Sequence, residues 1–213
     1  MQIKFKANKI ILFLSTSIFL SGYPLKVFGD PYEKKLTQKG PSKSLLVRDI
    51  NKRVALKLKK EKNLCSIGSG AEMMYEIKLL GLSFNYYDEI EIAKGRELLV
   101  FAASEYLDAI NNNVELRPYL DHWPFTANDI EIDIGILKPT GKEVDSDKIT
   151  FITCKKNRLN YYPRNDAIKT RAPALLTETY QQGVQILQDN KKQTSITTPA
   201  QVKPELFLEK AAM

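Results

Sequence analysis

Histidine and tryptophan each occur once in this 213-residue chain, and cysteine occurs twice. A single histidine without paired cysteines cannot supply a zinc cage, so we expect no metal site. The glycines Gly68 and Gly70 have neither the third glycine of a dinucleotide fingerprint nor the Lys-Ser/Thr of a phosphate loop. Ser69 between them does not fit the five-residue frame of a serine-hydrolase elbow. The sequence therefore predicts no cofactor.

The N-terminal apolar run is also short. It spans eleven residues, IILFLSTSIFL at 10–20, whereas a membrane-spanning helix needs ~20. It follows MQIKFKANK, which is basic and contains no acid, and this arrangement is typical of a secretory signal peptide rather than a permanent anchor. We expect cleavage after Gly29, because Val27 and Gly29 occupy the small-residue positions. The mature chain is then periplasmic or extracellular.

Positive charge is concentrated near the start of the mature chain. Loss of residues 1–29 removes four lysines and no acid, so the formal charge falls from +7 to +3. Residues 43–62 carry eight basic and two acidic side chains. Apolar residues recur there every four positions and predict an amphipathic helix from Ser44, with its stripe on the domain and its lysines in solvent: Leu46, Ile50, Val54 and Leu58. Contact of residues 44–62 with an anionic membrane is the alternative, and nucleic acid is not an expected partner.

Cys65 and Cys154 both lie in the mature chain and would meet an oxidising compartment. A single disulfide closing a long loop is one interpretation, and two separate buried thiols are the other. Sequence does not decide between them, because it does not show whether the two Cα atoms come within bridging distance.

The segments divide into a signal peptide (1–29), a Pro- and Gly-containing linker (30–43), a single domain (44–189) and a polar flexible tail (190–213). Residues 72–87 read as a strand bent near Gly81, with a helix over 71–80 as an alternative. AKGRELLVFAASEYLDAINNN predicts a long helix whose apolar face includes Leu99, Ala102, Ala103, Tyr106 and Ile110.

The stretch DIEIDIGIL alternates strictly and predicts a half-buried strand with four isoleucines on one side: Ile130, Ile132, Ile134 and Ile136. ITFITC and RLNYYP form a hairpin with Asn157 in the turn. A last helix opens at Pro173 and carries Leu176, Tyr180, Val184 and Leu187 on one side. The fold class predicted is α+β, an antiparallel sheet of about four strands packed against one long helix, flanked by an N-terminal amphipathic helix and a C-terminal helix.

Four segments in this order, GLSF, RELLVFAASEYLDAIN, LRPYLDHWPFT and IEIDI, resemble small secreted proteins of unknown function from intracellular Gram-negative bacteria of the chlamydia and legionella kind. The resemblance covers residues 72–163. It implies a secreted location and an expectation for the fold, and it carries over no catalytic residue.

RPYLDHWPFT, residues 117–126, holds the only His, the only Trp and two prolines. It joins the long helix to the isoleucine strand. As a structural loop it supplies Tyr119, Leu120, Trp123 and Phe125 to the core, and the Trp123–Pro124 bond is a candidate for the cis form. As a catalytic loop it offers His122 as a general base, with Cys65 as its nucleophile.

Glu131 and Asp133 share the outward side of the isoleucine strand, about 6.5–7 Å apart by strand rise, a spacing that suits paired acid–base work and equally a solvated face. Two functions follow. The preferred one is an exported non-enzymatic binding or accessory protein whose partner is a protein or an envelope component, contacted through the sheet face or through the loop: Arg117, Tyr119, Trp123 and Phe125, with Tyr86, Tyr87, Tyr161 and Tyr162. The alternative is a small hydrolase that uses His122 with Cys65 or the Glu131/Asp133 pair.

Overall fold

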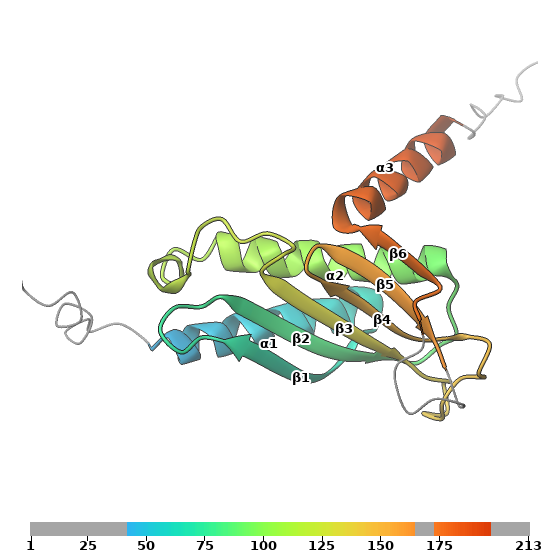
Figure 1. The fold of residues 1–213 in the computed structure, drawn as a ribbon, viewed down its shortest axis with the longest axis horizontal. Helices are drawn as coiled ribbons and strands as arrows, with labels where there is room; N and C mark the ends of the chain where they lie inside the picture. Colours follow the sequence, from blue (N-terminus) through green and yellow to red (C-terminus); the bar gives the residue numbers. More distant parts are fainter. Residues whose placement is uncertain (1–41, 165–172, 197–213) are drawn as a thin grey trace, which may run out of the picture. The chain divides into compact units, whose positions relative to one another are not determined.

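The computed structural model describes residues 42–164 and 173–196, all within the second of the two units into which the chain divides, Pro41–Met213 (Figure 1). The predicted signal peptide with its cleavage site, the linker up to residue 41 and residues 197–213 lie outside the described residues. The described elements run, in chain order, α1 (Lys43–Lys62), β1 (Cys65–Glu72), β2 (Leu79–Tyr86), α2 (Ile92–Asn111), a 3-10 turn (Arg117–Tyr119), β3 (Ile130–Ile136), β4 (Ile149–Lys155), β5 (Arg158–Pro163), β6 (Leu176–Thr179) and α3 (Tyr180–Ile196). No described helix is long and apolar enough to cross a bilayer.

The strands form one mixed sheet in the order β1-β2-β3-β4-β5-β6. Neighbouring strands are antiparallel except β2 and β3, which are parallel. The class α+β is confirmed, but the expectation of about four antiparallel strands on one long helix is wrong in detail. The 20-residue helix α2 connects β2 to β3, and a connection of that length returns the chain to the same end of the sheet, so the two strands run in parallel.

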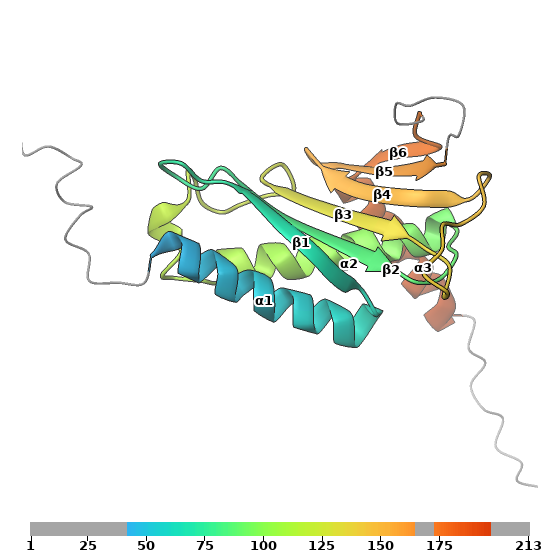
Figure 2. The same ribbon diagram turned by 90° about the horizontal axis from the view of Figure 1, so that it is seen from below.

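The helices lie on one side of the sheet (Figure 2). The predicted stripe of α1 is buried, as is the predicted apolar face of α2. All four isoleucines of β3 are at most 2 % exposed, so the predicted alternation is confirmed. Tyr106 of α2 is buried, and its hydroxyl donates to Asn51 Oδ1 of α1 at 2.7 Å. Burial raises the pKa of Tyr106 well above its ordinary value. The core therefore lies between this helical layer and one face of the sheet.

The segment predicted as one strand over 72–87 contains the end of β1, a connection and the strand β2, and β1 and β2 form a hairpin. β1 contains the Gly68–Ser69–Gly70 stretch and pairs with β2 from Glu72↔Leu79 to Cys65↔Asn85. Residues 71–80 form no helix in the structure. Glycine and serine carry no hydrophobic alternation, so the pattern that identifies β3 is missing from β1.

The hairpin of β4 and β5 is present, and the φ values of +50° at Lys156 and +59° at Asn157 confirm the predicted turn position. The last helix begins later than expected, because Leu176 belongs to β6 and α3 begins at Tyr180. The hydroxyl of Thr179 accepts from Gln182 N at 3.1 Å, while Gln182 Oε1 accepts from Thr179 N at 2.8 Å. This capping box fixes the start of the helix, and α3 extends to Ile196 rather than ending near residue 190.

Candidate functional site

The loop RPYLDHWPFT forms hydrogen bonds with the β1–β2 connection and with the end of α2. Ile77, in the β1–β2 connection, donates its N–H to Tyr119 O at 2.8 Å and accepts from Asp121 N at 2.9 Å. The side chain of Asn111, at the end of α2, donates to Phe125 O and accepts from Phe125 N, at 2.9 and 2.8 Å. The Trp123–Pro124 bond is cis. The backbone of the loop therefore holds the end of α2 against the β1–β2 connection, through the Asn111 side chain on one side and Ile77 on the other.

His122 lies at the surface of this loop, with its side chain 49 % exposed. Its Nε2 atom is 3.1 Å from Asp129 Oδ2, and its Nδ1 atom is 3.5 Å from Asp121 Oδ2. The hydroxyl of Thr126 donates to the same Asp129 oxygen at 2.8 Å instead of approaching the imidazole. Within residues 42–164 and 173–196, His122 thus has carboxylate partners but no hydrogen bond to a hydroxyl or thiol.

Cys65 is far from His122. It pairs with Asn85 at one end of the β1–β2 hairpin, whereas the loop is bound to Ile77 before the start of β2. Eight residues of extended chain separate Ile77 from Asn85, or roughly 25 Å at the rise of a strand. The structure therefore does not bring together the nucleophile and base suggested by the sequence.

The two cysteines are free thiols in the structure. Cys154 lies on β4 and Cys65 on β1, with β2 and β3 between them, so three strand spacings of about 4.8 Å hold their backbones at least about 14 Å apart. A disulfide needs Cα atoms within about 7 Å. The disulfide interpretation is wrong for this arrangement. Of the two buried thiols in the second interpretation, Cys154 is buried and Cys65 is only partly buried.

The four loop residues suggested as partner contacts divide into two groups. Arg117 stacks over the Trp123 ring at 4.0 Å, and Trp123 is half-exposed. Phe125 is buried, and Tyr119 packs partly buried against the core. Of these four residues, only Arg117 and Trp123 are on the surface.

The four tyrosines named with the sheet face also differ in exposure. Tyr161 is fully buried, whereas Tyr86, Tyr87 and Tyr162 are half-buried. The Tyr162 ring lies 6.3 Å from that of Phe151, measured between centroids. Tyr161 is therefore removed from the set of surface tyrosines.

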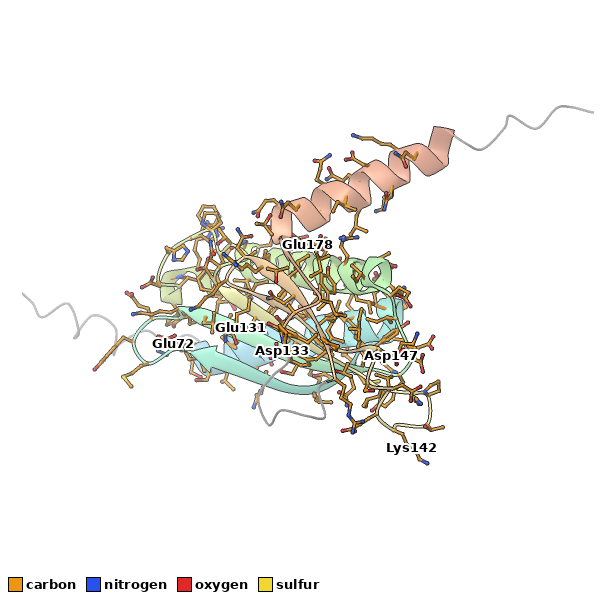
Figure 3. The ribbon with its side chains drawn as sticks, turned by 45° about the vertical axis from the view of Figure 1, so that its right-hand side comes forward. Glu72, Glu131, Asp133, Lys142, Asp147 and Glu178 are labelled. Atoms are coloured by element: carbon orange, nitrogen blue, oxygen red, sulfur yellow. The ribbon has the colours of Figure 1, made fainter. Side chains whose placement is uncertain are left out.

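Glu131 and Asp133 lie on the face of the sheet opposite the described helices, as the alternation of β3 predicts. Figure 3 shows them next to one another over the central strands. Glu131 forms an ion pair with Lys155 at 2.5 Å. Both acids belong to rows of directly paired residues, so the neighbours in each row point to the same side.

Two such rows cross all six strands on this open face. The first is polar and consists of Gly68, Ser83, Asp133, Thr153, Asn160 and Thr177. The second is charged and consists of Gly70, Gly81, Glu131, Lys155, Arg158 and Thr179. Asn160 joins its two neighbours, donating to Thr153 Oγ1 at 3.4 Å and accepting from Thr177 Oγ1 at 2.9 Å.

At the β1 end of these rows the glycines leave a hollow of about 430 Å³. Gly68 and Gly70 expose backbone where other residues would place side chains, Gly81 lies beside them on β2, and Glu131 and Asp133 line the adjoining strand. A Cβ atom added at Gly68 or Gly70 would meet nothing within 4 Å. The hollow therefore results from the absence of side chains and offers peptide groups and carboxylates to a ligand.

The sequence pattern places the two carboxylates on one face but does not indicate the glycines, which match neither a nucleotide-binding motif nor a serine-hydrolase elbow. The available signal was glycine at alternate positions of a strand, which in general marks close approach of a ligand or of another backbone.

No described group of three or more His, Cys, Asp or Glu side chains is arranged to hold a metal ion. No family model, curated protein or solved structure matches the chain.

Proposed function

We propose that the chain is an exported, non-enzymatic binding or accessory protein that contacts a protein or envelope partner through the open face of its sheet. The observation that supports this most directly is the hollow formed by Gly68, Gly70 and Gly81 beside Glu131 and Asp133.

The glycines are not required by the backbone conformation. Within the described residues only Gly141 has a positive φ among glycines, so Gly68 and Gly70 adopt conformations open to any residue, and there is room for a side chain at both. Glycine weakens a strand relative to a β-branched residue. A binding role that needs accessible backbone explains why glycine stands at positions 68 and 70, where it is unfavourable for the strand itself.

The carboxylates define the chemistry of the ligand. The side chain of Lys155 is 51 % exposed and that of Glu131 is 24 % exposed, so their ion pair contributes at most about 1 kcal/mol. A partner's ammonium or guanidinium group can replace Lys155 at little cost. The hollow therefore suits a segment that brings a cationic side chain and peptide groups.

Site-specific photo-crosslinking in the cells that produce the protein tests this proposal. A benzophenone amino acid at Ser83, in the hollow, is compared with the same group at Gln188, on the exposed side of α3. We expect a discrete adduct from Ser83 alone, lost when Gly70→Val fills the hollow. Ala71→Val is the matched control, because Ala71 lies in the same strand but pairs with Leu80, whose side chain is buried on the helix-covered face.

Equal adducts from both positions, or none from Ser83, would contradict the proposal. His122→Ala should leave the Ser83 adduct unchanged, whereas a hydrolase that depends on His122 would lose turnover with this substitution. Export has its own test: fractionation followed by N-terminal sequencing should give a periplasmic or extracellular chain that begins at Asp30. A full-length cytosolic chain would contradict export without bearing on the hollow.

A further inference from the structure

Within residues 42–164 and 173–196, β1 is an edge strand of the sheet. It pairs only with β2 among the described residues and is eight residues long, whereas β6 at the opposite edge has four and leads directly into α3. Natural edge strands usually carry lysine, proline or other charges that block pairing with a further strand. β1 has no charged residue before Glu72 and no proline, and its bulge between Ser66 and Gly68 leaves a regular stretch from Gly68 to Glu72.

A groove of about 490 Å³ lies between this edge and α1. Three basic residues of α1, Arg48, Lys52 and Lys59, line it together with Leu56 and Leu82. Positions 48, 52, 56 and 59 are four, four and three residues apart, which places them along one side of the helix. Leu56 is 63 % exposed, so apolar surface and positive charge adjoin the open strand edge.

The positive charge in the groove is not neutralised within the described residues. Lys59 donates to Asn63 Oδ1 and Cys65 Sγ, at 2.7 and 3.1 Å, while the exposed Arg48 and Lys52 form no described ion pair. No acidic residue lines the groove. An occupant with carboxylates on one side therefore has electrostatic partners already in place.

We propose that β1 takes up an extended acidic segment of a partner protein as an additional strand, with its carboxylates directed toward Arg48 and Lys52. Alternate side chains of an added strand point to opposite faces. The register that turns acids toward α1 is favoured over the one that turns them toward Glu131 and Asp133, because a one-residue shift exchanges the two faces. This inference goes beyond the proposed function by adding a contact at the edge of the sheet, next to the hollow, because the groove and the hollow share Gly68 and Ser69.

A second copy of this chain fits the edge less well. Antiparallel pairing of two β1 strands would place two α1 helices on the same face, and each carries eight basic against two acidic residues. Repulsion between the two basic helices on the same face opposes association of two copies. Charge therefore favours an acidic partner over self-pairing.

The test uses the full chain and a fluorescent nine-residue peptide that alternates glutamate with valine and threonine. We expect saturable binding that weakens as salt rises, and loss of hydrogen–deuterium exchange at the β1 amides. A lysine-for-glutamate peptide should bind at least about tenfold more weakly. Peptides N-methylated at alternate residues keep the charge but cannot pair as a strand in one register, and one of the two N-methylation patterns should abolish binding.

Variants of α1 provide the matched comparison. Arg48→Glu with Lys52→Glu should weaken binding of the acidic peptide at least about tenfold. Lys60→Glu is the control, because Lys60 is also exposed on α1 but does not line the groove. All three side chains are exposed, and circular dichroism verifies the fold of each variant.

Binding that is the same for both N-methylated patterns, or equally weakened by Lys60→Glu, would show a general attraction of anions to α1 and overturn the inference. Preferential binding of phosphatidylserine vesicles, or a concentration-dependent dimer with protected β1 amides, would overturn it in favour of a membrane or a second copy. If the peptide does not bind while the Ser83 adduct persists, the edge inference fails and the open-face proposal stands.

Discussion

Arg96 of α2 holds Glu178 of β6 through two hydrogen bonds, Nε to Oε1 at 2.7 Å and Nη2 to Oε2 at 3.0 Å. Tyr161 of β5 donates its hydroxyl to the same Glu178 Oε1 atom at 2.6 Å. The hydrogen bond to Glu178 raises the pKa of Arg96. Burial is the main cause that raises the pKa of Tyr161, and the hydrogen bond to Glu178 raises it further. The glutamate thus links two strands to a helix, at the base of α3 (Figure 3).

Glu178→Ala should lower the free energy of unfolding by about 3–5 kcal/mol, because it leaves the largely buried guanidinium of Arg96 without its partner. Urea unfolding followed by circular dichroism measures the loss. Glu105→Ala is the control: Glu105 pairs with the exposed Lys57, and a pair of that kind contributes about 0–1 kcal/mol. Losses of the same size in both variants would contradict a special role for the buried cluster.

Gly95→Ala should also destabilise the protein, although alanine is preferred to glycine in a helix by about 1 kcal/mol. A Cβ atom at Gly95 would lie 3.1 and 3.2 Å from two carbons of the Tyr161 ring. That ring is buried and its hydroxyl is held by Glu178, so it has little freedom to move, and overpacking costs about 1–3 kcal/mol. In the Glu178→Ala background the ring is released and the cost of Gly95→Ala should fall. An unchanged cost would refute this coupling.

The thiols should react in two steps. Cys154 is fully buried, and burial raises its pKa to about 12, so a thiol reagent at pH 8 should not modify it in the folded protein. Cys65 is partly exposed and should be modified without denaturant. We expect one modified thiol in native protein and two in urea, with no change after reduction. Cys65→Ser should show none until unfolding, and rapid native modification of Cys154 would contradict the packing of β4.

Acid should weaken the contact between α1 and α2. Lys62 of α1 donates to Glu97 of α2 at 2.7 Å, and Lys94 donates to the same carboxylate at 3.0 Å. Both hydrogen bonds lower the pKa of Glu97, and the one from Lys62 has the larger effect. A folded-state pKa below the unfolded one contributes stability above about pH 4.5, and this contribution is lost as pH falls through the folded pKa. Glu97→Gln should therefore destabilise the protein at pH 7 and matter less at pH 3. Replacement of both lysines by methionine should abolish this difference, and a persistent difference would point to another cause.

The elements predicted best are those in which burial imposes a period. Ile130 to Ile136 and the stripe from Leu46 to Leu58 are buried as their spacing requires. β1 and β6 were not predicted, because these edge strands bury few side chains and their residues show no alternation of apolar and polar side chains. The start of α3 could nonetheless have been predicted from the sequence, since Thr179 and Gln182 have the spacing of a capping box.

The candidate site was predictable only in part. Alternation in β3 places Glu131 and Asp133 on one face, but the hollow also needs Gly68 and Gly70 from β1 beside Gly81 of β2. That neighbourhood depends on the register of the hairpin and on the parallel β2–β3 pairing, neither of which follows from local pattern. For the same reason the sequence could not decide whether Cys65 and Cys154 form a disulfide, because only the strand order shows how far apart they lie.

Gly70→Val should separate stability from binding. The substitution adds a β-branched side chain to a strand at a position with an ordinary φ and open space, so it should raise the free energy of unfolding by about 0.5–1 kcal/mol. The same side chain occupies the hollow and should abolish the crosslink from Ser83. Ala71→Val, with its side chain on the other face, should preserve the crosslink. Because stability and binding then move in opposite directions, lost binding cannot result from unfolding, and a destabilised Gly70→Val protein would mean that the strand itself needs this glycine.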